Sequence, residues 1–437
     1  MRHSSSKLEG YDGVKELWRA SARNSFSANV LNADLDCDVA VIGGGYTGCS
    51  TALHGAELGL DVTLLEASTL GAGCSGRNSG NLNPGLWLTK EEICARLGEN
   101  SGNKLNSLLC NGPTEVRKLV EKHNIDCEFN ASGTFHCARD GRGLSELRAR
   151  AESQRLQGMD VQVLGADETK RHLGTEYFQS CLWNRDAASI QPLAYLRGLA
   201  QAATRHGARI FENSPATKIE RSGTQWLVHT PRGTLTAQAL VVATDAYHRD
   251  TRFGSINPMW RLWYFNCATD PLSKDYDHIL PSRQGCWDTG RVMTSFTRDV
   301  DGRFIIGSVG KLDSILSGIH LRWLKRRSIE LFPELGPVPL EFSWHGSMGM
   351  TPDQLPRLVD LGPRAIGSYG YSGRGIAPGT MFGQAIANYL HTDDPDMLPL
   401  KLSQTRYSVL KKFREPFYEM GALALHLIGA RSTGAAL

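Results

Sequence analysis

The feature that constrains the fold most is a strand, glycine turn, helix and second strand that follow one another within about thirty residues. A short apolar run at residues 38–42 predicts a buried strand, and the glycine-rich turn 43–48 follows it directly. Small residues at 47–58 predict a helix with Gly59 at its C-terminal end, and residues 61–66 predict the second strand. This β-α-β unit indicates an α/β fold with a parallel sheet.

The spacing of the glycines and of one acid indicates what this unit binds. Because 46 of the 437 residues are glycine, the pattern Gly43-x-Gly45-x-x-Gly48 alone is a weak signal. Glu66, however, ends the second strand 21 residues after Gly45, close to the spacing of about 20 expected for an acid that binds a ribose hydroxyl. The glycines allow a tight turn and the close approach of a pyrophosphate to the helix N-terminus. The sequence therefore predicts a dinucleotide site.

Two further glycine-rich segments lack acidic residues. Residues 68–90 contain Arg77 and no Asp or Glu, which suits an anionic diphosphate, although a surface loop with Arg77 in an ion pair is the alternative. The turn 370–380 leads into a predicted helix at 381–390, again without an acid. Its N-terminus and Arg374 would stabilise the negative charge of a reduced flavin. The alternative is a helix that packs only for stability.

Together these segments resemble the FAD-dependent D-amino-acid-oxidase-like superfamily, and are most similar to its γ-glutamylputrescine oxidase and pipecolate oxidase branch. The resemblance covers residues from about 36 to 395 and rests on the segments 41–48, 75–80, 242–247, 344–346, 351–356 and 371–375. It implies a Rossmann-like FAD-binding domain interleaved with an α+β substrate domain built on an antiparallel sheet.

The expected domain segments alternate along the chain. The FAD-binding domain is expected at 36–92, 183–255 and 341–395, the substrate domain at 93–182 and 256–340, and a tail helix at 396–437.

By the same resemblance, the first turn and Glu66 would hold the ADP half of FAD. Residues 75–78 would line the diphosphate and ring, Ala216 would approach the adenine, and residues 373–376 would cap the pyrimidine side. The expected cofactor-binding residues are Gly43, Gly45, Tyr46, Thr47, Gly48, Glu66, Ala67, Gly73, Ser75, Gly76, Arg77, Asn78, Ser79, Ala216, Ala243, Thr244, Gly373, Arg374, Gly375 and Ile376.

The chain departs from the family pattern at two points. The position of Arg374 is usually histidine in this branch, which affects the local charge or the fit of the substrate. Some members attach the flavin through a cysteine near the Thr-Pro-Asp segment, but residues 342–355 contain none. We therefore expect non-covalent FAD.

In the family, hydride passes from the carbon beside a neutral amine to flavin N5, and the resulting imine hydrolyses. The implied substrate is a primary or secondary amine, either an amino acid or a polyamine derivative. Tyr264, His345 and Arg374 are the candidates for catalytic, substrate-contacting residues. Alternation along a strand puts Leu262, Tyr264 and Asn266 on one face. The alternatives are a sheet-core aromatic for Tyr264, a structural histidine for His345, and a flavin-supporting or surface role for Arg374.

Composition narrows the remaining function classes. The net charge of +3 gives no reason to expect nucleic acid as a partner. The ten cysteines have no zinc-site spacing, so we expect no metal, and we expect reduced thiols in the cytoplasm. The apolar stretch 417–429 predicts a docked helix, or else a membrane contact that would favour a quinone-linked dehydrogenase over an oxidase using oxygen. A nicotinamide-dependent dehydrogenase and a non-catalytic flavoprotein remain as alternatives.

Overall fold

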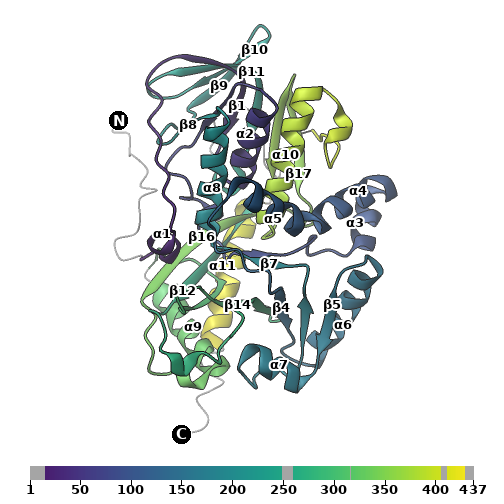
Figure 1. Ribbon diagram of the computed structural model, residues 1–437, viewed down its shortest axis with the longest axis vertical. Coiled ribbons are helices and arrows are strands. Elements are labelled where there is room, and N and C mark those ends of the chain that lie inside the picture. The colour runs from purple at the N-terminus through teal and green to yellow at the C-terminus, as the bar shows by residue number, and fades with distance from the viewer. Residues whose placement is uncertain (1–14, 249–258, 315, 405–410, 429–437) are drawn as a thin grey trace.

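The computed structural model describes residues 15–248, 259–314, 316–404 and 411–428. The described elements form two eight-stranded sheets with their helices, one in the upper half and one in the lower half of Figure 1, and a two-stranded sheet of β3 and β7. The predicted domain boundary at 255–256 lies outside the described residues, as do 405–410 and 429–437 of the predicted tail. The domain boundaries stay predictions.

In the described chain the first sheet has a parallel core in the order β18-β11-β1-β2-β8. The antiparallel strands β9 and β10 extend it from β11, and β17 pairs with β18. The strands are β1 (Leu35–Ile42), β2 (Val62–Leu65), β8 (Arg209–Phe211), β9 (Lys218–Ser222), β10 (Gln225–His229), β11 (Thr234–Val242), β17 (Arg357–Gly362) and β18 (Ala365–Tyr369). The strands β9, β10 and β11 thus form an antiparallel meander whose last strand ends in the buried residues 239–242.

Apolar side chains of β1 alternate between the two faces of this sheet, so both faces are buried, and helices cover one of them. Val39 and Val41 pack toward the helices, whereas Ala40 and Ile42 pack toward the meander. The covering helices are α2 (Tyr46–Glu57), α5 (Gly112–His123), α8 (Pro192–Arg205) and α10 (Ile376–Thr392). Helix α8 begins at Pro192, a residue favoured in the first turn of a helix, and the Gln191 side chain caps it. The strand, turn and helix of the first motif are therefore built into the sheet core.

Glycines let α10 approach α2 closely. A Cβ atom on Gly383 would lie 2.5 Å from the Thr47 carbonyl oxygen, and one on Gly379 would lie 3.2 Å from Thr47 Oγ1. Only glycine allows the two helices to pack at this separation, so the beginnings of α2 and α10 lie together.

The second sheet has the order β16-β12-β15-β14-β13-β4-β6-β5 and is antiparallel except between β13 and β4. Phe265, Phe296 and Phe304 form its core with Leu324 and Leu331 of α9. Its strands are β4 (Thr134–Cys137), β5 (Val161–Leu164), β6 (Cys181–Asn184), β12 (Trp260–Ala268), β13 (Gly285–Asp288), β14 (Thr294–Arg298), β15 (Phe304–Val309) and β16 (Phe342–Met350). The predicted α/β fold with an antiparallel second sheet is confirmed.

The helices that accompany the second sheet are α6 (Gly141–Leu156), α7 (Ala166–Leu173), α9 (Ser317–Leu331) and α11 (Lys411–Ile428). Helix α11 docks beside β12 and α9 (Figure 1) and buries Ala422, Leu423 and His426. No helix in the described ranges is long and apolar enough to cross a membrane. The remaining elements are α1 (Leu17–Ser21), α3 (Lys90–Leu97), α4 (Glu99–Cys110), β3 (Asn81–Leu82), β7 (Ala188–Ser189), η1 (Cys74–Gly76), η2 (Asp245–Tyr247), η3 (Lys274–Tyr276), η4 (Pro333–Leu335) and η5 (Pro395–Met397).

Candidate active site

The first glycine turn is shaped by close backbone contacts. Gly43 has φ +104°, a left-handed conformation that favours glycine. A Cβ atom on Gly48 would lie 1.9 Å from the Gly43 carbonyl oxygen, so Gly48 is required for the turn itself. Gly45, the N-cap of α2, instead lines a cavity. The turn thus presents the N-terminus of α2 to open space, where its dipole favours an anion.

A cavity of about 370 Å³ lies at this turn and at the carboxyl ends of β1, β2 and β11. Nine of the predicted cofactor residues line it, namely Gly43, Gly45, Glu66, Ala67, Gly73, Ser75, Ala216, Ala243 and Thr244. Ligands of open parallel sheets bind at this edge. The residues present therefore fit the ADP half of a dinucleotide.

Glu66 holds the glycine turn through backbone hydrogen bonds. Its carboxylate accepts from Gly44 N at 2.8 Å and from Ser68 N at 2.9 Å. Burial raises the pKa of Glu66 above its usual value. A carboxylate has about four lone-pair positions, so Glu66 retains acceptor capacity for a ribose hydroxyl.

The two predicted glycine turns meet directly. Thr47 Oγ1 and Tyr371 Oη share a hydrogen bond of 2.7 Å, and Tyr371 Oη shares another of 2.7 Å with Ser368 Oγ. Asp245 Oδ1 accepts from Gly370 N at 2.7 Å, which ties the second turn to the end of β11. The N-termini of α2 and α10 are therefore held side by side.

A second cavity, of about 400 Å³, opens between these helix N-termini and the second sheet. Its predicted lining residues are Gly45, Tyr46, Thr47, Ser75, Arg77, Asn78, Ser79, Ala243, Tyr264, Gly373, Arg374, Gly375 and Ile376. The two cavities share five residues, Gly45, Cys74, Ser75, Ala243 and Asp245. They therefore adjoin at the start of α2, as a site for an extended dinucleotide requires.

Two predicted glycines line neither cavity. Gly48 supports the turn as described above, and a Cβ atom on Gly76 would lie 2.3 Å from the Gly71 carbonyl oxygen. Both glycines act through backbone packing next to the site.

The loop after β2 is fastened to the second sheet. The Arg77 carbonyl oxygen accepts from Trp344 Nε1 at 3.0 Å and from Asn266 Nδ2 at 3.3 Å. The Arg77 side chain lines the second cavity and also forms an ion pair with Glu16, with Nε and Oε2 3.4 Å apart. Arg77 therefore both forms an ion pair and lines the cavity, so the two interpretations of this residue do not exclude each other.

Alternation along β12 and β16 separates two of the predicted substrate residues. Leu262 and Tyr264 line the second cavity, and Tyr264 pairs with Gly346 across the strands. Tyr264 Oη donates to Ser295 Oγ at 2.8 Å, and burial raises its pKa. His345 is one residue from Gly346 and points to the opposite face.

His345 is not among the residues that line the cavity. Its ring packs edge-on against Trp263, with centroids 5.3 Å apart, and burial lowers its pKa to about 4. The placement of His345 does not support the predicted substrate contact, because the sheet itself separates it from Tyr264 and Arg374.

Arg374 lies against two tryptophan rings at the second cavity. Its guanidinium carbon is 4.3 Å from the Trp87 ring centroid and 5.9 Å from that of Trp287, and Nη1 donates to the Pro84 carbonyl oxygen at 3.2 Å. Burial, with Arg150 nearby, lowers its pKa to about 9, so it is still a cation at neutral pH. Within the described residues no carboxylate pairs with it, and its Nε is buried without a hydrogen bond.

Sequence reasoning missed several residues of the second cavity. Asp245 and Tyr371 lie inside the quoted motifs and could have been found there, and Trp87 lies in the acid-free loop. Trp287 lies on β13, far from any motif, and no sequence signal marks it.

The chain is similar in sequence to known proteins over most of its length. A family model described as FAD dependent oxidoreductase matches residues 38–389. The chain belongs to this family. The family resemblance predicted from the motifs is confirmed, and the enzyme class is that of an FAD-dependent oxidoreductase. This result favours flavin over the nicotinamide alternative.

Individual relatives resemble the chain over most of its length. Gamma-glutamylputrescine oxidoreductase of Escherichia coli (strain K12) is 29% identical over 413 residues, or 93% of this chain and 96% of the relative. Glycine oxidase of Geobacillus kaustophilus (strain HTA426) is 23% identical over 383 residues, or 84% and 97%.

Solved structures confirm the fold. The crystal structure of glycine oxidase from Geobacillus kaustophilus matches with a TM-score of 0.70 at 19% identity, over 85% of this chain and 99% of that chain. L-Amino acid deaminase from Proteus myxofaciens, in complex with anthranilate, matches with a TM-score of 0.71 at 17% identity, over 86% and 95%.

Proposed function

We propose that this flavoenzyme oxidises the C–N bond of a small primary or secondary amine that also carries a carboxylate, with FAD bound non-covalently. When bound, the flavin supplies the chemistry by accepting hydride from the carbon beside the amine. The protein's residues bind the cofactor, orient the amine and keep water from the reacting atoms. Because the flavin accepts the hydride and the amine is neutral, the protein needs no dedicated catalytic base.

The observation that carries the proposal is the environment of Arg374. A cation that lies against two indole rings, without a carboxylate partner in the described chain, is best satisfied by an anionic ligand. The guanidinium can bind a carboxylate with two parallel hydrogen bonds, which fixes direction as well as charge. Arg374 would then anchor the substrate beside the N-terminus of α10.

The remaining wall of the cavity suits the rest of such a substrate. Leu262, Met348 and Trp287 are apolar or aromatic, and the Tyr264 hydroxyl is within the same lining. A neutral amine enters an apolar environment at much lower cost than a charged one. The printed names of the relatives, gamma-glutamylputrescine oxidoreductase and glycine oxidase, support an amine or amino acid as substrate.

Non-covalent attachment is supported by the state of Cys74, which among the described residues is the one cysteine that lines the two cavities. Burial raises the pKa of Cys74 to about 12, so it stays a thiol, which is a poor nucleophile. Acid precipitation tests this point: the flavin should appear in the supernatant, and flavin that stays in the pellet would contradict it.

The reduced flavin is reoxidised either by oxygen or by another electron acceptor. Helix α11 docks beside β12 and α9 and leaves Phe417, Met420 and Leu427 exposed. Peroxide release in air would establish an oxidase, whereas turnover only with an added dye would establish a dehydrogenase.

The cytoplasm is our proposed location. All ten cysteines are free thiols, which is typical of a reducing compartment.

The function is tested by mixing the purified yellow holoenzyme anaerobically with amino acids, N-methyl amines and polyamine derivatives. Absorbance near 450 nm should bleach with amines that carry a carboxylate, and much less with matched amines that lack it. A flavin that no amine reduces would overturn the proposed reaction and favour a non-catalytic flavoprotein.

A further inference from the structure

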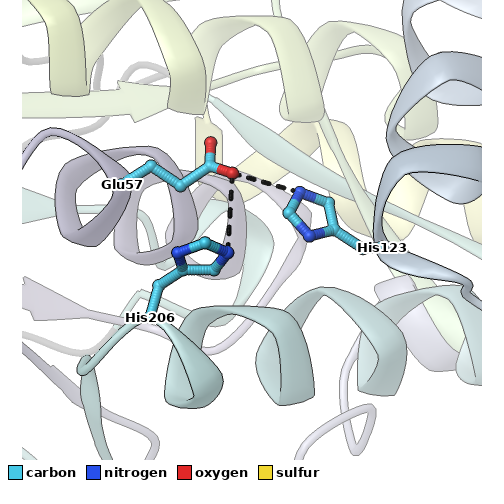
Figure 2. Close-up of side chains that lie close together, drawn as sticks. All are labelled: Glu57, His123 and His206. Carbon is cyan, nitrogen blue, oxygen red and sulfur yellow. Dashed lines mark ion pairs between the residues drawn. The ribbon is translucent and has the colours of Figure 1, made fainter.

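Three helices that cover the first sheet end at one cluster of side chains. Glu57 is the last residue of α2, His123 is the last residue of α5, and His206 follows α8 as its C-cap. Glu57 Oε1 lies 3.3 Å from His123 Nε2 and 3.7 Å from His206 Nε2 (Figure 2). The three candidate ligand atoms lie within 4.8 Å of one another.

The histidine on α5 is unusual because it is buried and incompletely satisfied. The His123 side chain is only 4% exposed, and its Nε2 makes no hydrogen bond within the described chain although it faces Glu57. Burial lowers the pKa of His123, which favours the neutral ring that metals bind. His206 is 42% exposed, so solutes reach the cluster from its side.

We propose that Glu57, His123 and His206 form a binding site for a divalent transition metal, with zinc as the best fit, that clips together the C-terminal ends of α2, α5 and α8. Two imidazoles and one carboxylate are a ligand set that zinc accepts, with water in the fourth position. Zinc–ligand distances of about 2.0–2.2 Å in a tetrahedron place ligand atoms roughly 3.4 Å apart. The two separations from Glu57 already match this, and rotation of the exposed His206 closes the third.

An ammonium group holds the carboxylate when no metal is bound. Lys122 Nζ lies 2.6 Å from Glu57 Oε1, and the Lys122 side chain is 59% exposed. Exposed ion pairs of this kind contribute little free energy, so a divalent cation can displace the lysine into solvent. This arrangement predicts that Lys122 competes with the metal.

The cluster lies at the far end of α2 from Gly45, and none of its three residues lines either cavity. The metal would therefore act by joining helices, and its binding can be measured without turnover. Metal that binds the folded chain raises its melting temperature by mass action.

The test uses holoenzyme treated with a chelator and dialysed, then titrated calorimetrically with zinc alone. We expect saturable binding at one site and a rise in Tm. His206→Ala should weaken the binding at least tenfold, because even loss of an outer partner of a metal ligand costs about 10–100-fold. Lys122→Ala should bind zinc more tightly than the unmodified chain.

The matched control is His278→Ala. His278 is also an exposed histidine paired with a glutamate, and its Nε2 lies 2.7 Å from Glu334 Oε1. This substitution should leave zinc binding unchanged. Flavin absorbance of each variant confirms that it is folded. The proposal is overturned if the unmodified chain binds no zinc, if His206→Ala binds it equally well, or if Lys122→Ala binds it more weakly.

Discussion

The hydroxyl groups of Thr47 and Tyr371 share a hydrogen bond of 2.7 Å, although the two residues are 324 positions apart in the sequence. Thr47 lies in the first turn of α2, and Tyr371 lies in the turn that precedes α10. The bond fixes two helix N-termini at one cavity, where their dipoles favour the same anionic ligand.

Tyr371→Phe removes the hydroxyl that bonds both Thr47 and Ser368. Both partners are buried, so we expect a loss of about 1–3 kcal/mol in the free energy of unfolding and weaker FAD retention. Urea unfolding and flavin fluorescence measure the two effects. Tyr389→Phe, on α10 itself, is the control, because no hydrogen bond of its hydroxyl is found among the described residues. Equal stability of the two variants would contradict the role of Tyr371.

Gly48→Ala should prevent the first turn from forming. The added methyl group would lie 1.9 Å from the Gly43 carbonyl oxygen, a backbone atom that cannot move aside. We expect a destabilisation of about 3 kcal/mol or more, with loss of bound flavin. Gly421→Ala is the control, since a methyl group there meets open space in α11 and should stabilise the helix by up to about 1 kcal/mol. Full flavin content in Gly48→Ala would refute the assignment of the turn.

Arg374→Gln should weaken binding of substrates through their carboxylate. Loss of a charged hydrogen bond costs about 1.5–3 kcal/mol, or roughly 10- to 150-fold in the dissociation constant measured from anaerobic flavin reduction. The matched amine without a carboxylate should change little. Arg291→Gln is the comparison, because Arg291 also lines the cavity but is exposed. If only Arg291→Gln has the effect, the anchor is misplaced.

Substitutions of Tyr264 and of His345 should have different effects on flavin reduction, although the two residues lie on paired strands. Tyr264→Phe removes a hydroxyl from the cavity wall and its bond to Ser295, so flavin reduction should slow by roughly fivefold, about 1 kcal/mol. His345→Asn, on the other face, should leave the rate unchanged. Stopped-flow absorbance compares the two. A larger effect in His345→Asn would show that His345 reaches the substrate after all.

Low pH should loosen the docking of α11. His320 and His426 are buried with their Nδ1 atoms 2.7 Å apart, and burial lowers the pKa of both, that of His426 to about 3 with Arg326 and His320 contributing. Because the folded pKa is below the usual 6.5, the unfolded chain takes up protons first as pH falls. Stability is therefore full above pH 6.5 and lost below it, by about 1.4 kcal/mol per pH unit for each proton.

Thermal unfolding between pH 7 and 5 measures this loss. In His426→Phe the slope of Tm against pH should become shallower. A slope that is unchanged would place the titrating groups elsewhere.

The sequence predicted the first sheet and its helices well because local signals and packing agree there. Residues 38–66 carry apolar strands, glycines and an acid at the spacing that their contacts require, and Pro192 marks the start of α8. The glycine turn from Gly370 likewise precedes a helix, but α10 begins at Ile376, five residues before the predicted start at 381.

The second sheet was harder to predict because its strands pair across long sequence distances. The strand β5 pairs with β6, and β6 in turn pairs with β4, so both depend on partners elsewhere in the sequence. Trp287 reaches the cavity through the pairing of β13 with β4, and no local pattern announces that pairing. The substrate contact of His345 stays a prediction, because its motif fixes the strand but not which face of that strand is turned to the cavity.

The order of strands along the chain also determines how early in synthesis each sheet can be completed. In the described chain, β1 and β2 are followed by strands of the other sheet, and the first sheet is finished only when β17 and β18 are added after β16. The residues that line the second cavity accordingly come from 45–87, 243–245, 262–309 and 346–376. During synthesis, the chamber beside the start of α10 can therefore close only after nearly the whole chain has left the ribosome.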